Sequence, residues 1–231
     1  MRDVIELSHK LYPDKAVVDV GVNVGQFLLE LKAINGKAPY YGFEPNPACV
    51  FYVFELIRLN RFASTCIFPV AVADGDRISY LFSSAWDSGT STLVKEFSKG
   101  REEFSTTVYS VNGDDIFDSI DEEISLIKID VEGFEYNVLS GLAGTLEKYR
   151  PLVFCEINIS LHESDNLKLM KSRLEDTHSL MKNLNYIPCG TGFSGERVVI
   201  DDVDAYSGLL SDYLFVPAEI MENVQEHFSN L

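Results

Sequence analysis

Short apolar runs that alternate with helix-period stretches constrain the fold of this chain more than any other feature of its sequence. Compact apolar runs typical of buried strands stand at residues 16–20, 40–43, 66–72, 124–129 and 152–157. Apolar residues at helical spacing predict helices at residues 3–11, 26–34, 47–60, 114–120, 137–149 and 167–184. Strands that alternate with helices predict an α/β fold, with a mostly parallel sheet covered by helices on both faces.

Residues 76–112 interrupt this alternation. Two β-like segments, 78–82 and 106–111, flank a stretch rich in Ser, Gly and Thr. We interpret the region as an antiparallel and loop insertion in one domain that spans residues 1–231, because the length suits a single domain. Strand-like pieces in the tail, at residues 186–189, 197–200 and 213–216, are expected to close the sheet as an antiparallel edge.

The net charge of −17 narrows the range of partners. Nucleic-acid affinity rests on Lys and Arg that neutralise phosphates, so we expect no nucleic-acid partner. No stretch reaches the roughly 18 apolar residues of a membrane span. The four cysteines have no paired spacing, and the first residues are not a secretory signal, which together predict a cytoplasmic protein. The oligomeric state stays open, and a homo-oligomer is compatible with the sequence.

The first two predicted strands end in residues suited to a nucleoside. Asp19 lies in the first strand, and the turn behind it holds Gly21, Asn23 and Gly25. Glycines allow a tight turn whose backbone N–H groups face a ligand. Glu44 ends the second strand, about 20 residues past the turn, where an acidic side chain can accept hydrogen bonds from both ribose hydroxyls.

Further carboxylates follow the later strands. Asp130 and Glu132 come after the fourth strand, and Glu156 and Asn158 end the fifth. Ligands of open α/β sheets bind at the carboxyl ends of the strands, so these side chains should share one edge. A dinucleotide pyrophosphate would be repelled there, whereas the sulfonium and ammonium groups of S-adenosylmethionine would be attracted. The turn also lacks the G-x-G-x-x-G spacing of dinucleotide sites.

Five segments between residues 17 and 158 resemble the FkbM family of methyltransferases: DVGVNVGQF (Asp19–Phe27), FEPNP (Phe43–Pro47), PVAVADG (Pro69–Gly75), IKIDVEGFEYNVLSGL (Ile127–Leu142) and RPLVFCEI (Arg150–Ile157). The resemblance implies a Rossmann-like class I fold with a seven-stranded sheet. It also implies transfer of a methyl group from S-adenosylmethionine to a hydroxyl of a sugar, nucleotide sugar, polysaccharide or similar small metabolite.

The resemblance assigns a role to each matching position. It places Asp19, Gly21, Asn23 and Gly25 at the methionine moiety, Glu44 at the ribose, Ala73 and Asp74 near the adenine, and Asp130 and Glu132 at the methyl-transfer site.

Activation of the acceptor hydroxyl leaves two arrangements open, since an alcohol is a poor nucleophile at neutral pH. In the first, Asp130, Glu156 and Asn158 hold Mg²⁺ or Mn²⁺ through oxygen atoms. In the second, a carboxylate such as Glu132, or His162, removes the proton. We favour the metal because hard oxygen ligands converge without a competing His/Cys set.

Two other functions compete with O-methylation. The first is methylation of nitrogen or of nucleic acid, which the residues after the fourth strand disfavour because they lack an Asn/Asp-Pro-Pro-Tyr/Phe motif. The second is a non-catalytic nucleoside-binding module of the same fold.

Overall fold

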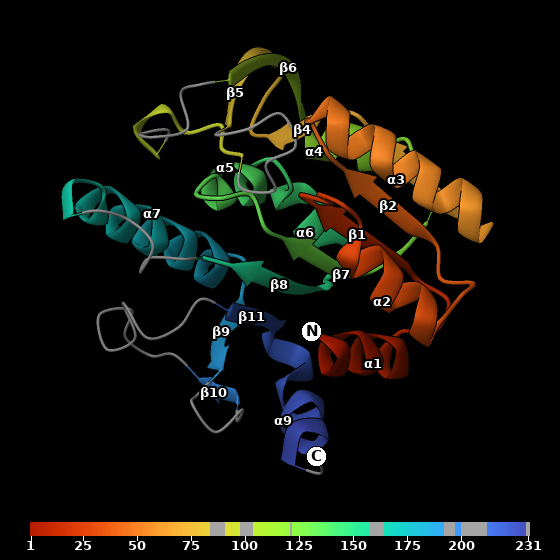
Figure 1. Ribbon diagram of the computed structural model, residues 1–231. Helices are drawn as coiled ribbons and strands as arrows, with labels where there is room; N and C mark the ends of the chain where they lie inside the picture. The colour runs from red at the N-terminus through yellow and green to blue at the C-terminus, as the bar shows by residue number, and fades with distance from the viewer. Residues whose placement is uncertain are drawn as a thin grey trace.

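The computed structural model describes residues 1–83, 91–97, 104–120, 122–157, 164–191, 197–199 and 212–229 (Figure 1). Its α-helices are α1 (Arg2–Leu11), α2 (Gln26–Ile34), α3 (Pro47–Asn60), α4 (Gly113–Phe117), α5 (Glu135–Ser140), α6 (Ala143–Tyr149), α7 (Ser164–Asn183) and α9 (Met221–Ser229). Its strands are β1 (Ala16–Val20), β2 (Tyr40–Phe43), β3 (Thr65–Phe68), β4 (Ala71–Ala73), β5 (Arg77–Ser83), β6 (Phe104–Asn112), β7 (Ile124–Ile129), β8 (Leu152–Glu156), β9 (Tyr186–Thr191), β10 (Arg197–Val199) and β11 (Asp212–Pro217). Short 3₁₀ turns stand at Lys95–Phe97 and Ala218–Ile220.

The main sheet has the strand order β10-β9-β11-β8-β7-β1-β2-β3. The strands β8, β7, β1, β2 and β3 of this sheet run parallel to one another. Strand β11 pairs antiparallel with both β8 and β9. The expected seven-stranded, mostly parallel sheet with an antiparallel edge is therefore confirmed, and the short β10 extends that edge. This order brings the carboxyl ends of β1, β2, β7 and β8 to one side of the molecule.

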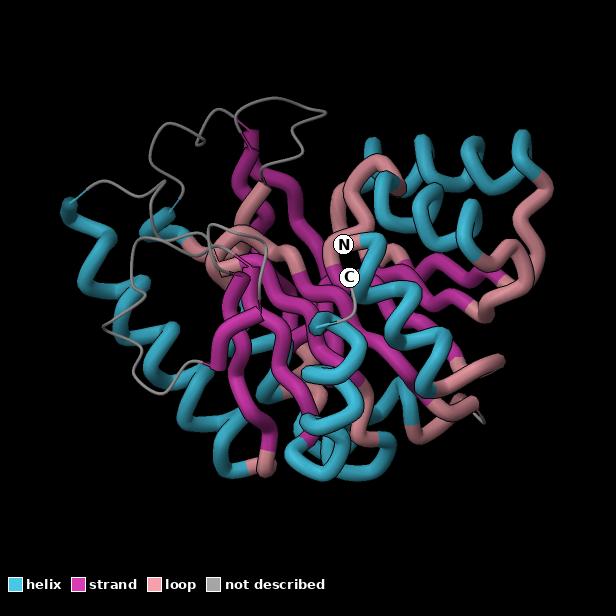
Figure 2. The backbone as a smooth tube through the Cα atoms, turned by 90° about the horizontal axis from the view of Figure 1, so that it is seen from below, coloured by secondary structure: helices cyan, strands magenta, loops and turns pink. Residues whose placement is uncertain are grey.

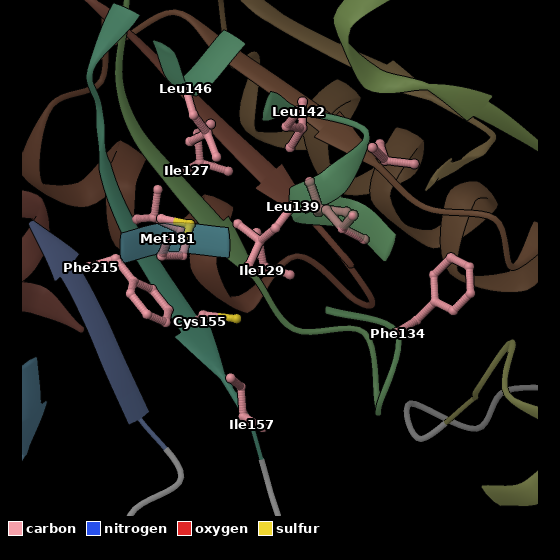
Figure 3. Packing of buried hydrophobic residues seen from close by; sticks show 14 of the residues in the cluster. Ile127, Ile129, Phe134, Leu139, Leu142, Leu146, Cys155, Ile157, Met181 and Phe215 are labelled. Atoms are coloured by element: carbon pink, nitrogen blue, oxygen red, sulfur yellow. The ribbon is translucent and has the colours of Figure 1, made fainter. Parts of the chain in front are cut away.

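Helices cover both faces of the main sheet, as the alternation predicts (Figure 2). On one face α4, α5, α6 and α7 pack on the central strands, and Leu139, Leu146 and Met181 are fully buried against Ile127 and Ile129 (Figure 3). On the other face α1, α2, α3 and α9 contribute to a second apolar cluster. The local period alone predicts most elements, but α9 was not expected from the sequence.

The continuous strand expected at residues 66–72 is wrong. The segment is divided into β3, at the edge of the main sheet, and β4, which pairs with β6 in a separate sheet of order β4-β6-β5. Pro69 lies at the break, and proline has no N–H to donate to a strand ladder. The chain therefore leaves the first sheet here and enters the second, where β5 and β6 pair antiparallel.

The continuous helix expected at residues 137–149 is also wrong, because it is broken between α5 and α6 at Gly141 and Leu142. A Cβ atom on Gly141 would lie 1.8 Å from the Ala73 carbonyl oxygen. Only glycine allows so close an approach, so the break presses against the end of β4. Gly141 thus couples the helical layer to the small sheet.

Candidate active site

A cleft of about 630 Å³, part of it open to solvent, lies at the carboxyl ends of β1, β2 and β7. Five of the residues predicted from sequence line it: Gly21, Asn23, Glu44, Asp130 and Glu132. The structure therefore brings together side chains from three different strand ends, as the position of those strands in the sheet requires.

The two walls of the cleft differ in chemistry. The wall from the main sheet carries the carboxylates and the Gly21 turn, whereas the other wall is largely apolar. That second wall comes from the β3–β4 connection and the small sheet with its attached segment: Val70, Ala71, Val72, Leu81, Ser91 and Leu93. The cleft therefore offers both polar and apolar surface to a ligand.

The turn after β1 is built on left-handed backbone. Gly21 has φ +88°, and a Cβ atom there would lie 2.0 Å from the Asp130 carbonyl oxygen. Asn23 also has a positive φ of 52°, a conformation that Asn tolerates better than most residues. The glycine therefore lets the β1 turn lie directly against the end of β7, which places Asp130 beside the turn.

Glu44 uses both carboxylate oxygens to hold the loops around it. Oε2 accepts a hydrogen bond from the Asn23 backbone N–H at 2.8 Å, and Oε1 accepts one from the Asn46 N–H at 2.8 Å. Burial raises the pKa of this carboxyl, while the two N–H donors lower it. Each oxygen keeps a further lone pair for a ligand in the cleft.

Asp19 is fully buried and does not line the cleft. Its Oδ2 accepts a hydrogen bond from the Tyr40 hydroxyl at 2.6 Å, and its Oδ1 lies 3.2 Å from the Lys128 ammonium. Burial raises the pKa of Asp19, and Lys128 and Tyr40 act against that effect. Burial lowers the pKa of Lys128, but Asp19 and Asp130 together leave it raised.

The turn that carries Glu132 is held by side chains from three other places in the chain. Glu132 and Gly133 have positive φ angles of 53° and 98°. The Thr92 hydroxyl donates to the Glu132 carbonyl at 2.8 Å, and Arg173 of α7 donates to the Gly133 carbonyl at 3.0 Å. The Gly133 N–H donates to Glu135 at 2.8 Å. This turn is therefore fixed before any ligand arrives.

Glu156 ends β8, opposite Asp212 of β11. It does not line the cleft. Partial burial raises its pKa to about 7, and the charges of Asp130, Asp212 and Glu132 add to the effect. Among the described residues no three His, Cys, Asp or Glu side chains are arranged to hold a metal ion. Asn158 and His162, the other predicted ligand and base, lie outside the described residues.

Besides Asp19, three predicted cofactor residues do not line the cleft. Gly25 starts α2 with φ +85°, and Ala73 is buried in β4. Asp74 is partly exposed and accepts a hydrogen bond from Arg77 at 2.6 Å. Conversely, the cleft includes residues that sequence reasoning did not single out: Asn46, Cys49, Val70, Ser91, Leu93 and Phe134. Asn46 precedes Pro47 as a helix N-cap, and that signal places it at a strand–helix turn.

Among the described residues, no helix combines the length and the apolar character that crossing a bilayer requires.

A parallel sheet with a glycine turn after β1, an acidic residue after β2 and a carboxylate-lined cleft defines a Rossmann-like, nucleoside-binding class of α/β protein. Within that class the chain belongs to the FkbM methyltransferase family, since the model of the Methyltransferase FkbM domain matches residues 19–188. The expected resemblance is thereby confirmed.

A curated relative and two solved structures are similar to this chain. The hexuronic acid methyltransferase AglP of Haloferax volcanii is 29% identical over 174 residues, which are 73% of this chain and 67% of AglP. The crystal structure of a methyltransferase FkbM from Methylobacillus flagellatus gives a TM-score of 0.51 at 17% identity, over 87% of this chain but only 43% of that one. The SAH-bound methyltransferase PaMTH1 of Podospora anserina gives 0.50 at 8% identity, over 92% and 74%. The two structures support the fold.

Proposed function

We propose that this protein is an S-adenosylmethionine-dependent O-methyltransferase whose acceptor is a hydroxyl of a sugar or a similar small metabolite. One observation carries the proposal: Glu44, Asp130 and Glu132 line the cleft, and no Lys or Arg is among the described residues that line it. A cleft of this charge suits a cationic, phosphate-free nucleoside and opposes a pyrophosphate. Family membership supports methyl transfer as the reaction.

The residues present fit this cofactor. The Glu44 oxygens have lone pairs left for the two ribose hydroxyls, and the apolar wall offers a surface for a purine ring. A side chain at position 21 would collide with the Asp130 backbone, so the cradle of the turn exists only with glycine. Asp130, which follows β7 and lies beside that turn, would face the cationic part of the cofactor. When bound, the cofactor supplies an electrophilic methyl group.

The chain must orient the acceptor oxygen and lower its affinity for its proton. The oxygen has to lie about 3 Å from the methyl carbon, opposite the sulfur. Both arrangements predicted from sequence remain proposals. In one, Asp130, Glu156 and Asn158 bind Mg²⁺ or Mn²⁺; in the other, Glu132 or His162 removes the proton.

The sugar acceptor is supported by the relative from Haloferax volcanii, whose name describes methylation of hexuronic acid. Net charge −17 supports a small molecule over a nucleic acid. We further propose that residues 1–231 act as one domain with 76–112 as an insertion. The cytoplasm is the proposed compartment, because the four cysteines are free thiols.

Calorimetry and mass spectrometry test this proposal in two steps. Wild-type protein should bind S-adenosylmethionine and S-adenosylhomocysteine, and should not bind NAD. Neutral sugars, uronic acids and nucleotide sugars are then incubated with S-adenosylmethionine, and one class should gain the mass of one methylene group. Asp130→Asn should abolish the gain while S-adenosylhomocysteine still binds. A protein that binds neither sulfur compound is not a methyltransferase of this kind.

A chelator separates the two arrangements of the acceptor. If a metal ion activates the hydroxyl, EDTA stops turnover and added Mg²⁺ or Mn²⁺ restores it. If EDTA does not change the turnover rate, a protein base removes the proton from the acceptor hydroxyl instead.

A further inference from the structure

Lys128 is a buried lysine that lies behind the proposed site without lining its cleft. It lies in β7 with 7% of its surface exposed, and its ammonium contacts three groups from two strand ends. It donates to the Gly21 carbonyl at 2.8 Å and lies 3.2 Å from Asp19 and 3.5 Å from Asp130. The contact with Gly21 is a hydrogen bond, whereas the contacts with the two carboxylates are ion pairs, and Asp19 Oδ1 accepts no hydrogen bond within the described residues.

Two of the three partners of Lys128 line the cleft, whereas the third does not. Gly21 and Asp130 border the cleft and also a second hollow, which Lys128 itself lines. Asp19 lies beneath them with no exposed surface. It therefore touches no ligand in the cleft directly, and the contacts it makes are with Tyr40 and Lys128.

Removal of either charge would disturb this arrangement in a defined way. Without Lys128, the Gly21 carbonyl and the Asp130 carboxylate lose the ammonium that both contact, and Asp19 remains a buried carboxylate with no cation beside it among the described residues, hydrogen-bonded to Tyr40. Without the charge on Asp19, the ammonium loses its deepest anchor and is free to move toward Asp130. Breaking one side of a buried ion pair is far more disruptive than removing both sides.

We propose that Lys128 is a positioning residue that fixes the Gly21 turn and the Asp130 carboxylate for the cofactor, and that Asp19 acts on the cofactor only through Lys128. The inference rests on the proposed function, because the ligand it concerns is the cofactor of that function. It changes the role of Asp19 from a direct cofactor contact, as the resemblance implies, to the anchor of a buried lysine.

The test measures dissociation constants of S-adenosylmethionine and S-adenosylhomocysteine by calorimetry for four proteins: wild type, Lys128→Met, Asp19→Asn and the double variant. Lys128→Met should weaken both compounds by a similar factor of about tenfold or more, as for loss of one charged hydrogen bond. Asp19→Asn should weaken both in the wild-type background. It should add nothing in the Lys128→Met background, because its effect passes through the missing lysine.

Lys32→Met is the matched control. Lys32 of α2 is also buried, and its ammonium donates to the carbonyls of Ala38 and Ala63 at 2.7 and 2.8 Å, away from the cleft. It should lower the melting temperature and leave both dissociation constants unchanged. Tyr40→Phe, which removes one hydrogen bond from Asp19, provides a milder variant if Lys128→Met does not fold. It should weaken both compounds in the same direction as Asp19→Asn.

Three results would overturn the inference. The first is a Lys128→Met protein that melts earlier but binds both compounds as wild type, which makes the lysine structural only. The second is tighter binding, which shows that its charge and not its position matters. The third is full additivity of the two substitutions. Absence of binding in the wild-type protein would instead overturn the proposed function itself, and the inference with it.

Discussion

Replacement of Glu44 by Gln is the most direct probe of the cofactor site. Both oxygens of Glu44 accept backbone N–H groups, from Asn23 and Asn46, each at 2.8 Å. A glutamine has a single oxygen, so one of these N–H groups must face an NH₂ group in a position that is 7% exposed. Loss of this hydrogen bond to a charged acceptor lowers the free energy of unfolding by about 1.5–3 kcal/mol. Removal of the buried charge offsets part of that loss.

The same substitution removes the charged acceptor proposed for the ribose. We expect S-adenosylhomocysteine to bind about tenfold or more weakly, since each 1.4 kcal/mol corresponds to a factor of ten. Calorimetry with an analogue that lacks the ribose 2′-hydroxyl sharpens the test. If Glu44 accepts a hydrogen bond from that hydroxyl, the analogue should bind the wild type more weakly than S-adenosylhomocysteine does. The two compounds should differ little in their affinity for Glu44→Gln.

Glu55→Gln serves as the control, because Glu55 is exposed on α3 and pairs with Arg58 at 2.7 Å. Glu55→Gln should leave the affinity for S-adenosylhomocysteine and for the analogue unchanged. Equal binding of S-adenosylhomocysteine by wild type and Glu44→Gln would refute the ribose assignment. Independent losses from the substitution and from the missing hydroxyl would do so too.

Three further predictions concern stability, each measured by urea unfolding. Asp114→Ala should lower the free energy of unfolding by about 1–2 kcal/mol, because the Asp114 carboxylate accepts hydrogen bonds from two backbone N–H groups and from the Thr145 hydroxyl at the start of α6. Asp115→Ala, at an exposed neighbouring position, should change this free energy little. Burial lowers the pKa of His178 from 6.5 to about 4, so the unfolded chain takes up the proton at a higher pH than the native protein. Between pH 7.5 and 5 the wild type should therefore lose about 2 kcal/mol more free energy of unfolding than His178→Phe. Equal losses in the two proteins would refute this prediction. Burial raises the pKa of Glu135 to about 7, so the native state loses stability as the pH rises from 4.5 through 7. Glu135→Gln should therefore be about 2 kcal/mol more stable than wild type at pH 8 and should show a smaller gain at pH 5. An equal gain at both pH values would contradict this prediction.

The sequence predicts the local elements well because their signals are local. The apolar period of residues 26–34 and 47–60 reproduces α2 and α3, and the apolar runs at 16–20, 40–43 and 124–129 reproduce β1, β2 and β7. The Rossmann-like fold follows from their alternation. The division of residues 66–72 was missed, although Pro69 carried the signal for it, because the period within the run looked continuous.

The candidate site was predicted less completely, since it depends on contacts between distant residues. The strand ends place Gly21, Glu44 and Asp130 together, and that follows from the order of elements. The burial of Asp19 does not follow, because it depends on Lys128, more than a hundred positions later in the chain. Thr92 is likewise far in sequence from the Glu132 carbonyl that it holds. Sequence position alone carries no register between such segments.

The separation of β3 and β4 at Pro69 determines what joins the two sides of the cleft. The residues from the main sheet and those from the small sheet belong to separate strand ladders. Val72 and Ala73 of β4 nevertheless share a buried apolar cluster with Val20 and Phe43 of the main sheet, and the Thr92 hydroxyl donates a hydrogen bond to the Glu132 carbonyl. The width of the cleft is therefore set by side-chain packing across this cluster and not by a shared ladder of backbone hydrogen bonds.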